Sequence, residues 1–285
     1  MKRIKNSSIL SGAAWRVFVA AALGVSLAAG CSRPSDVDRL EWTSMGTVAA
    51  LQTRGDAGSK GAGADSQEVG AALVAVQEVF LRVEREFSRF DTNSVLRRTG
   101  RVTAFGQPCW DAAMALREAS GGAFDPAWRG KGDLDFGAIA KGYAVDVAAD
   151  AAMRAGGAGA LLIDLGGNLK AVRGTWRTGV RSPVGDDVAA VVALRPGKAL
   201  STSAEYFRGK HIFDARTGRP VSNEVASVTV LCDSAMWADG LSTTLFVLGL
   251  AEGRRFLRTE LPKLPQAPRN VSVFWILQDG RIERD

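Results

Sequence analysis

Apolar residues recur at steps of three and four through residues 69–87, which is the strongest helical period in the chain. The positions that carry this period are Val69, Leu73, Val76, Phe80, Val83 and Phe87. The sequence also predicts helices over 108–120 and 137–157, because glycines follow the last apolar position of each. A fourth helix is predicted over 234–249, with Ser234 as its N-cap and Gly249 at its end.

Apolar and β-branched runs between these segments predict strands, and several of them follow one another without a helix between them. The expected strands are 42–53, 160–167, 175–182, 188–194, 225–232 and 271–277. This order favours an α+β fold with largely antiparallel sheets and packed helices over a doubly wound parallel sheet. Residues 54–66 are rich in Gly, Ala and Ser, and predict a flexible loop inside the domain.

The first 30 residues have the pattern of a secretory signal. Basic residues are followed by 13 uncharged residues, too few to span a bilayer as a helix, and then by Gly30 and Cys31. We expect 1–30 to be a lipoprotein signal, Cys31 to carry a lipid, and 31–41 to be a tether before a domain over 42–285. Such a protein is exported and anchored to a membrane facing the periplasm; ordinary signal cleavage or an uncleaved anchor are the alternatives.

Removal of this leader changes the charge of the chain. Four of the 36 basic residues and none of the 30 acidic ones lie in 1–30, so the net charge falls from +6 to +2. The basic isoelectric point therefore indicates no nucleic-acid partner. The remaining cysteines, Cys109 and Cys232, fit no metal spacing, and we expect them to be unpaired and buried.

Asp239 is a carboxylate in an otherwise apolar predicted helix, with Thr243 one turn later on the same face. A buried, unpaired carboxylate costs several kcal/mol, so Asp239 needs a cation or hydrogen-bond donors. A Mg²⁺ ion would suit a carboxylate and a hydroxyl. The alternative is a structural aspartate, with Thr243 bonded back to its own helix.

Two further stretches contain candidate residues. In 134–146, Gly137 opens a helix whose N-terminal amides and Lys141 suit a phosphate; a solvated lysine is the alternative. In 199–220, polar residues crowd a stretch that we expect to be a loop. It holds the only histidine of the chain, His211, which excludes a multi-histidine zinc site. The roles left for His211 are a general base, a hydrogen-bond donor to phosphate, or a structural hydrogen bond.

Taken in order, these motifs resemble the FAD:protein FMN transferase family over roughly residues 42–280. The motifs that carry the resemblance are SMGT (44–47), EFSRFDTNS (86–94), GGAFDP (121–126), LDFGAIAKGYAVD (134–146), IDLGGN (163–168), ALSTSAEYF (199–207), HIFDARTGRP (211–220) and SVTVLCDSAMWADGLSTTLFVLG (227–249).

The resemblance implies an α+β fold that binds FAD in a cleft, with Mg²⁺ on its diphosphate. The metal would be held by Asp239, Thr243 and the backbone carbonyl of Ala138. The positions that match FAD contacts in the family are Met45, Ser88, Phe90, Ala123, Asp135, Lys141 and Phe213. His211 and then Asp214 are the candidate general bases.

The implied reaction transfers FMN from FAD to a threonine or serine hydroxyl of an exported or membrane flavoprotein, and releases AMP. The sequence departs from many relatives in having only seven residues between Pro126 and Leu134, which would leave the cleft more open. The alternatives are therefore an FAD pyrophosphatase, which yields FMN and AMP, and a non-enzymatic FAD-binding lipoprotein.

Overall fold

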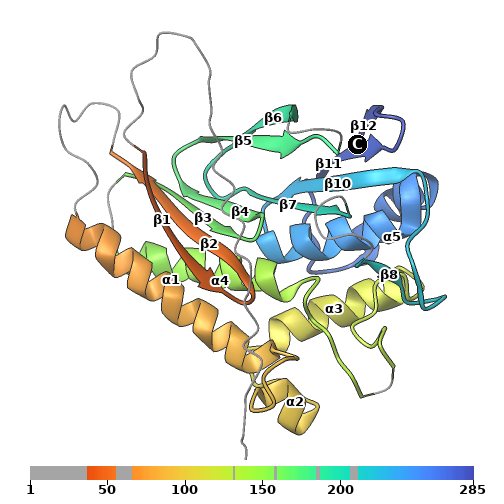
Figure 1. Ribbon diagram of the computed structural model, residues 1–285, viewed down its shortest axis with the longest axis horizontal. Helices are drawn as coiled ribbons and strands as arrows, with labels where there is room; N and C mark the ends of the chain where they lie inside the picture. Colours follow the sequence, from red (N-terminus) through yellow and green to blue (C-terminus); the bar gives the residue numbers. More distant parts are fainter. Residues whose placement is uncertain (1–36, 56–65, 131, 157–158, 184–186, 206–210) are drawn as a thin grey trace, which may run out of the picture. The chain divides into compact units, whose positions relative to one another are not determined.

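The computed structural model describes residues 37–55, 66–130, 132–156, 159–183, 187–205 and 211–285 (Figure 1). The predictions for the signal, for Cys31 and for most of the 54–66 loop lie outside these residues. None of the helices in the described ranges combines the length and the apolar character that a membrane span requires.

An eight-stranded sheet forms the centre of the fold, and every neighbouring pair in it is antiparallel. Its strands, in spatial order, are β1 (Val37–Ser44), β2 (Thr47–Arg54), β3 (Ala160–Leu165), β4 (Asn168–Arg173), β7 (Ala199–Ala204), β10 (Val225–Cys232), β11 (Ser272–Leu277) and β12 (Ile282–Arg284). Two smaller pairs are β5 (Trp176–Arg181) with β6 (Val188–Leu194), and β8 (Phe213–Asp214) with β9 (Arg219–Pro220).

Helices cover one face of this sheet and the β5–β6 hairpin covers the other (Figure 1). The helices are α1 (Ser66–Phe87), α2 (Val95–Thr99), α3 (Gln107–Ala119), α4 (Ala140–Arg154) and α5 (Ala235–Thr259), followed by a short 3₁₀ helix (Leu261–Lys263). Successive residues of a strand point to opposite faces, so Ile163 and Leu165 join the helical core, whereas Leu162, the residue before Ile163, packs under the hairpin. The predicted α+β fold with antiparallel sheets is confirmed.

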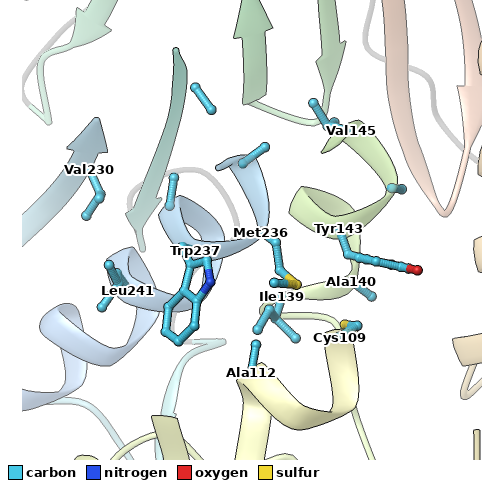
Figure 2. Close-up of a cluster of buried hydrophobic side chains, with 14 of the residues drawn as sticks. Cys109, Ala112, Ile139, Ala140, Tyr143, Val145, Val230, Met236, Trp237 and Leu241 are labelled. Atoms are coloured by element: carbon cyan, nitrogen blue, oxygen red, sulfur yellow. The ribbon is translucent and has the colours of Figure 1, made fainter. Parts of the chain in front are cut away.

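Two connections hold the helices of the described residues, and a third holds the β8–β9 pair. The segment containing α1 to α4 lies between β2 and β3, and α5 lies between β10 and β11. The β8–β9 pair lies between β7 and β10. Figure 2 shows how α3, α4 and α5 meet, with Met236 of α5 pointing toward Ile139 at the start of α4, and Cys109 of α3 close by.

Several predicted boundaries need correction. Residues 37–41 are not part of a tether, because they pair with β2 as the first half of β1, so the folded part begins before residue 42. The helix predicted from 137 begins at Ala140, because residues 137–139 form a turn. The helix predicted to end at Gly249 does change direction there, with φ of 74°, and a second helical segment follows.

The stretch from residue 199 is not a loop at its start. Residues 199–204 form β7 in the middle of the sheet, where Ser201 and Ser203 are buried. Their hydroxyls have hydrogen-bond partners in neighbouring elements, so the polar residues cost little in a buried strand. The two cysteines are unpaired and buried, as predicted.

Candidate functional site

α4 and α5 come close together at Gly142. A Cβ atom added there would lie 2.6 Å from the carbonyl carbon of Ala235, closer still to its oxygen, and 2.8 Å from Cβ of Asp239. Only a glycine fits between the two backbones at this position. The contact brings the first turn of α4 against the side chain of Asp239.

Asp239 is buried at this crossing, with 5% of its surface exposed. Its Oδ2 accepts a hydrogen bond from the amide of Gly142 at 3.0 Å and lies 3.8 Å from Nζ of Lys141. Burial raises the pKa of the Asp239 carboxyl, and the Lys141 ammonium and the Gly142 amide act in the opposite direction. Both partners bind Oδ2, and within the described ranges Oδ1 has no hydrogen bond.

A second aspartate makes the reverse contact. Asp146 of α4 accepts hydrogen bonds from the backbone amides of Ala235 and Met236, both at 2.9 Å, and from Oγ of Ser234 at 2.6 Å. Nζ of Lys170 also donates to it, at 2.6 Å. Each of the two helices therefore supplies a carboxylate to the N-terminal turn of the other, where free amides favour negative charge. Sequence reasoning had given Asp146 no role.

Thr243 lies one turn after Asp239 and is partly buried. If Thr243 had a purely structural role, its hydroxyl would be expected to bond to a carbonyl of its own helix, and it does not. It instead lies 3.1 Å from Oγ of Ser203 on β7, and the same serine lies 2.9 Å from Oγ of Ser242. Ser203 and Ser242 were also missed by sequence reasoning, since no periodic pattern marks them.

The turn before α4 is arranged around Asp135 and Lys141. The carboxylate of Asp135 accepts a hydrogen bond from the amide of Gly137 at 2.9 Å, and Nζ of Lys141 donates to the carbonyl of the same glycine. Ala138 follows in this turn and is partly buried. Lys141 therefore connects the turn to Asp239, and the structure brings Asp135, Ala138, Lys141 and Asp239 into one region.

Arg89 links this turn to the end of α1. Its Nε lies 3.2 Å from Asp135, and its guanidinium carbon lies 4.2 Å from the ring centre of Phe90. Phe90 is 82% exposed, so the ring is available to a ligand. Ser88 accepts a hydrogen bond from the amide of Asp91, at 3.2 Å, and shapes the same loop.

Two of the residues predicted to contact FAD have little exposed side chain. Met45 has φ of 48° in the turn between β1 and β2, and it packs partly against the helical core. Ala123 is buried in the turn after α3. These positions could offer backbone groups, rather than side chains, to a bound nucleotide.

The β8–β9 region holds the remaining candidates. Trp128 stacks on Phe213 with ring centres 4.8 Å apart, so one face of the Phe213 ring is already covered. Arg216 binds the carboxylate of Asp214 at 2.8 Å, and this pairing lowers the pKa of the Asp214 carboxyl. A carboxylate with a lowered pKa is a weaker base. His211 is exposed.

The residues around Asp239 fit a hard divalent ion. Oxygen ligands suit Mg²⁺, and here a buried carboxylate with one oxygen unbonded stands one turn from a hydroxyl on the same helix face. In the described residues, no group of three or more His, Cys, Asp or Glu side chains forms a protein-only metal cage. The donor set therefore suits an ion that completes its coordination with backbone oxygen, water or a ligand phosphate.

The antiparallel sheet with α4 and α5 crossing on one face defines a fold that is shared with solved flavin transferases. The ApbE protein from Thermotoga maritima matches with a TM-score of 0.71 at 24% identity, over 87% of this chain and 97% of that one. The flavin transferase ApbE from Vibrio cholerae matches with a TM-score of 0.68 at 24% identity, over 88% and 97%. These likenesses establish the fold.

Sequence comparison points to a family. Residues 128–266 match the model of the ApbE family. Curated relatives named FAD:protein FMN transferase include one from Vibrio cholerae, 37% identical over 135 residues, which are 42% of this chain and 40% of that protein. Another, from Treponema pallidum, is 32% identical over 171 residues, or 52% and 45%. The matched stretch thus spans less than half the length of these relatives.

Proposed function

We propose that this protein transfers FMN from FAD to a threonine or serine hydroxyl of a flavoprotein, with Mg²⁺ as cofactor and AMP as product. The observation that carries the proposal is Asp239, a buried carboxylate with one oxygen unbonded, placed against Lys141 and the N-terminal turn of α4. It lies within the stretch that matches the ApbE family.

The side chains of Asp239 and Thr243 and the backbone carbonyl of Ala138 would hold the metal ion. Bound there, Mg²⁺ supplies neutralisation of the charge on the FAD diphosphate. Lys141 and the free amides at the start of α4 would bind the same phosphates, because a helix N-terminus favours anions. Positioning of the two reacting groups would supply most of the rate.

The reaction is substitution at phosphorus. The acceptor hydroxyl oxygen forms a bond to the phosphorus of the FMN half, the bond from that phosphorus to the bridging oxygen breaks, and AMP leaves with that oxygen. The hydroxyl proton goes to a base. We assign this role to His211 rather than to Asp214, because Arg216 holds Asp214 as an ion pair and lowers its basicity.

The other predicted contacts would bind the rest of FAD. The exposed ring of Phe90 and the uncovered face of Phe213 suit the flat rings of the nucleotide. Asp135 would accept hydrogen bonds from it, with Ser88 beside it. Met45 and Ala123 would contribute backbone groups.

We also propose that the protein is exported and held at a membrane by a lipid on Cys31, with a flavoprotein of the same compartment as acceptor. The support is the order of basic, apolar and small residues before Cys31. Mass spectrometry of the mature N-terminus tests this: a diacylated cysteine is expected, and a free N-terminal residue other than Cys31 would contradict it.

The test of the activity uses purified protein with FAD and Mg²⁺, with and without an acceptor flavoprotein. We expect AMP release that depends on the acceptor, and covalent FMN on an acceptor threonine or serine by mass spectrometry. Equal FMN release in both mixtures would instead mean FAD hydrolysis. FAD binding without AMP in either mixture would mean a storage protein.

Two variants make the test specific. Asp239→Ala should abolish AMP release, since the metal would lose its carboxylate. Asp150→Ala is the matched control, because it removes an exposed carboxylate from α4 and should leave the rate unchanged.

A further inference from the structure

Three hydroxyls meet between β7 and the second turn of α5. Oγ of Ser203 lies 2.9 Å from Oγ of Ser242 and 3.1 Å from Oγ1 of Thr243. Oγ of Ser242 also donates to the backbone carbonyl of Asp239, at 3.0 Å. Ser203 and Ser242 are buried. Within the described residues, these contacts form a short chain of hydrogen bonds that ends at the carbonyl of Asp239.

The direction of each hydrogen bond in this chain follows from counting protons. A hydroxyl carries one proton and a carbonyl carries none, so the three contacts have three protons between them. Ser242 must give its proton to the carbonyl of Asp239, because that oxygen is only an acceptor. Ser203 must then donate to Ser242, and Thr243 must donate to Ser203.

This order fixes what Thr243 offers on its other side. Its proton points toward β7, so both lone pairs of Oγ1 remain for a second partner that does not accept a hydrogen bond, such as a cation. The neighbouring Thr244 shows the usual alternative, since its hydroxyl bonds back to the carbonyl of Gly240 at 2.7 Å. Thr243 does not adopt this arrangement, because its hydroxyl donates a hydrogen bond to Ser203 instead.

We infer that Ser203 is a positioning residue, which holds the Thr243 hydroxyl as a lone-pair donor for the divalent cation. This inference rests on the proposed function, because it concerns the same cation. Without the Ser203 hydroxyl, Thr243 has no acceptor on β7, and its proton turns to the carbonyl one turn earlier. The oxygen then no longer presents both lone pairs to the ion.

Mn²⁺, followed by its electron paramagnetic resonance signal, measures cation binding directly in the full chain with FAD bound. Ser203→Ala is expected to weaken Mn²⁺ binding about tenfold, as loss of a group that orients a metal ligand commonly does. The KM for FAD at saturating Mn²⁺ should stay within about twofold, because Ser203 orients a metal ligand and does not bind the nucleotide. A purely structural role would change both quantities together.

Ser201→Ala is the matched control. Ser201 lies on the same face of β7, is also buried and donates its hydrogen bond to Asn168 at 2.7 Å. It should therefore leave Mn²⁺ binding unchanged, although it costs a similar hydrogen bond. If both serine variants weaken Mn²⁺ binding equally, the inference is wrong.

Two further variants separate the possible failures. Thr243→Val should nearly abolish Mn²⁺ binding; if it does not, the metal site of the proposed function is wrong, and the inference with it. If Thr243→Val weakens binding and Ser203→Ala does not, only the inference is wrong. Should Ser203→Ala fail to fold, Ser242→Ala replaces it, since the free Ser203 proton can then turn toward Thr243; Mn²⁺ binding weakened by about threefold is expected, and unchanged binding overturns the inference.

Discussion

Replacement of Gly142 by alanine tests the α4–α5 crossing on which the site is built. The new methyl would lie 2.6 Å from the carbonyl carbon of Ala235 and 2.8 Å from Cβ of Asp239, whereas carbon atoms in contact prefer about 3.5–4.0 Å. Both obstacles belong to a helix backbone or to the atom next to it, so no rotamer change relieves them. The helices must move apart by about 1 Å.

The expected cost has three parts. Overpacking of a core site costs about 1–3 kcal/mol, and the hydrogen bond from the Gly142 amide to the Asp239 carboxylate, 3.0 Å long, is worth about 1.5–3 kcal/mol. Alanine is the better helix former by about 1 kcal/mol, which acts in the other direction. The net loss in free energy of unfolding is about 1.5–5 kcal/mol, or about 3–20 °C in Tm for a chain of this length.

Differential scanning calorimetry of Gly142→Ala measures this loss, with Gly70→Ala as the control. Gly70 lies in α1, and a Cβ added there meets nothing within 4 Å, so that variant should gain up to about 1 kcal/mol from helix propensity alone. Gly240→Ala should fall between the two, since its Cβ would meet the flexible end of Leu116 at 2.6 Å. If Gly142→Ala were as stable as Gly70→Ala, the close crossing and the Asp239 contact built on it would be refuted.

Three other variants probe single contacts. Asp239→Asn should raise Tm at pH 7 without metal, because burial raises the pKa of the folded-state carboxyl above its usual 3.8 and the ionised carboxylate therefore destabilises the fold. This gain in Tm should disappear as the pH falls toward and below 3.8, where the carboxyl becomes protonated in both states. A Tm difference between variant and wild type that does not change with pH would contradict this. Asp146→Ala should cost at least about 3 kcal/mol in urea unfolding, since the start of α5 loses charged hydrogen bonds and Lys170 loses its carboxylate partner. A loss under about 1 kcal/mol would show that water replaces the carboxylate. Trp128→Ala should weaken FAD binding about 2- to 10-fold in a fluorescence titration, from about 0.5–1.5 kcal/mol of lost stacking against Phe213, and unchanged affinity would place the flavin elsewhere.

The periodic elements of this fold could be predicted from the sequence because burial on one face leaves a simple trace. The apolar period of α1 and the β-branched run of β10 both mark segments that pack against the core. The fold class followed from the order of these segments. The position of each strand in the sheet could not, because pairing between β4 and β7 depends on contacts across an intervening hairpin.

β7 shows why a buried strand can be invisible to pattern reading. Its serines and threonine would be costly in the core if their hydroxyls lacked partners, and the partners come from β4, β10 and α5, which are distant in sequence. The same contacts explain why Ser203 could not be predicted as a site residue. The polar residues of 199–204 indicated a loop, because their hydrogen-bond partners are distant in sequence and leave no pattern in this segment.

The candidate site was partly predictable for a related reason. A carboxylate in an apolar helix is an exception to the burial rule, and Asp239 was identified on that ground. The sequence placed Lys141 near a helix start, but the contact between Lys141 and Asp239 depends on Gly142, which allows α4 and α5 to approach. That glycine looked like any other small residue in its motif.

The two aspartates at this crossing differ in how completely their carboxylates are hydrogen-bonded, and this difference distinguishes a structural role from a functional one. Asp146 accepts four hydrogen bonds that involve both of its oxygens, from two amides, a serine and a lysine, so its charge is fully used in holding the start of α5. Asp239 stands in the matching position toward α4, is more deeply buried, and has one hydrogen bond and one lysine at 3.8 Å, both on Oδ2. A fold that needed Asp239 only as a cap would be better served by the arrangement around Asp146. Asp239 thus has fewer partners for its charge than Asp146, and it lies near a threonine hydroxyl whose lone pairs are free. A bound cation would supply the missing partner, which explains why the Asp146 carboxylate is fully hydrogen-bonded and the Asp239 carboxylate is not.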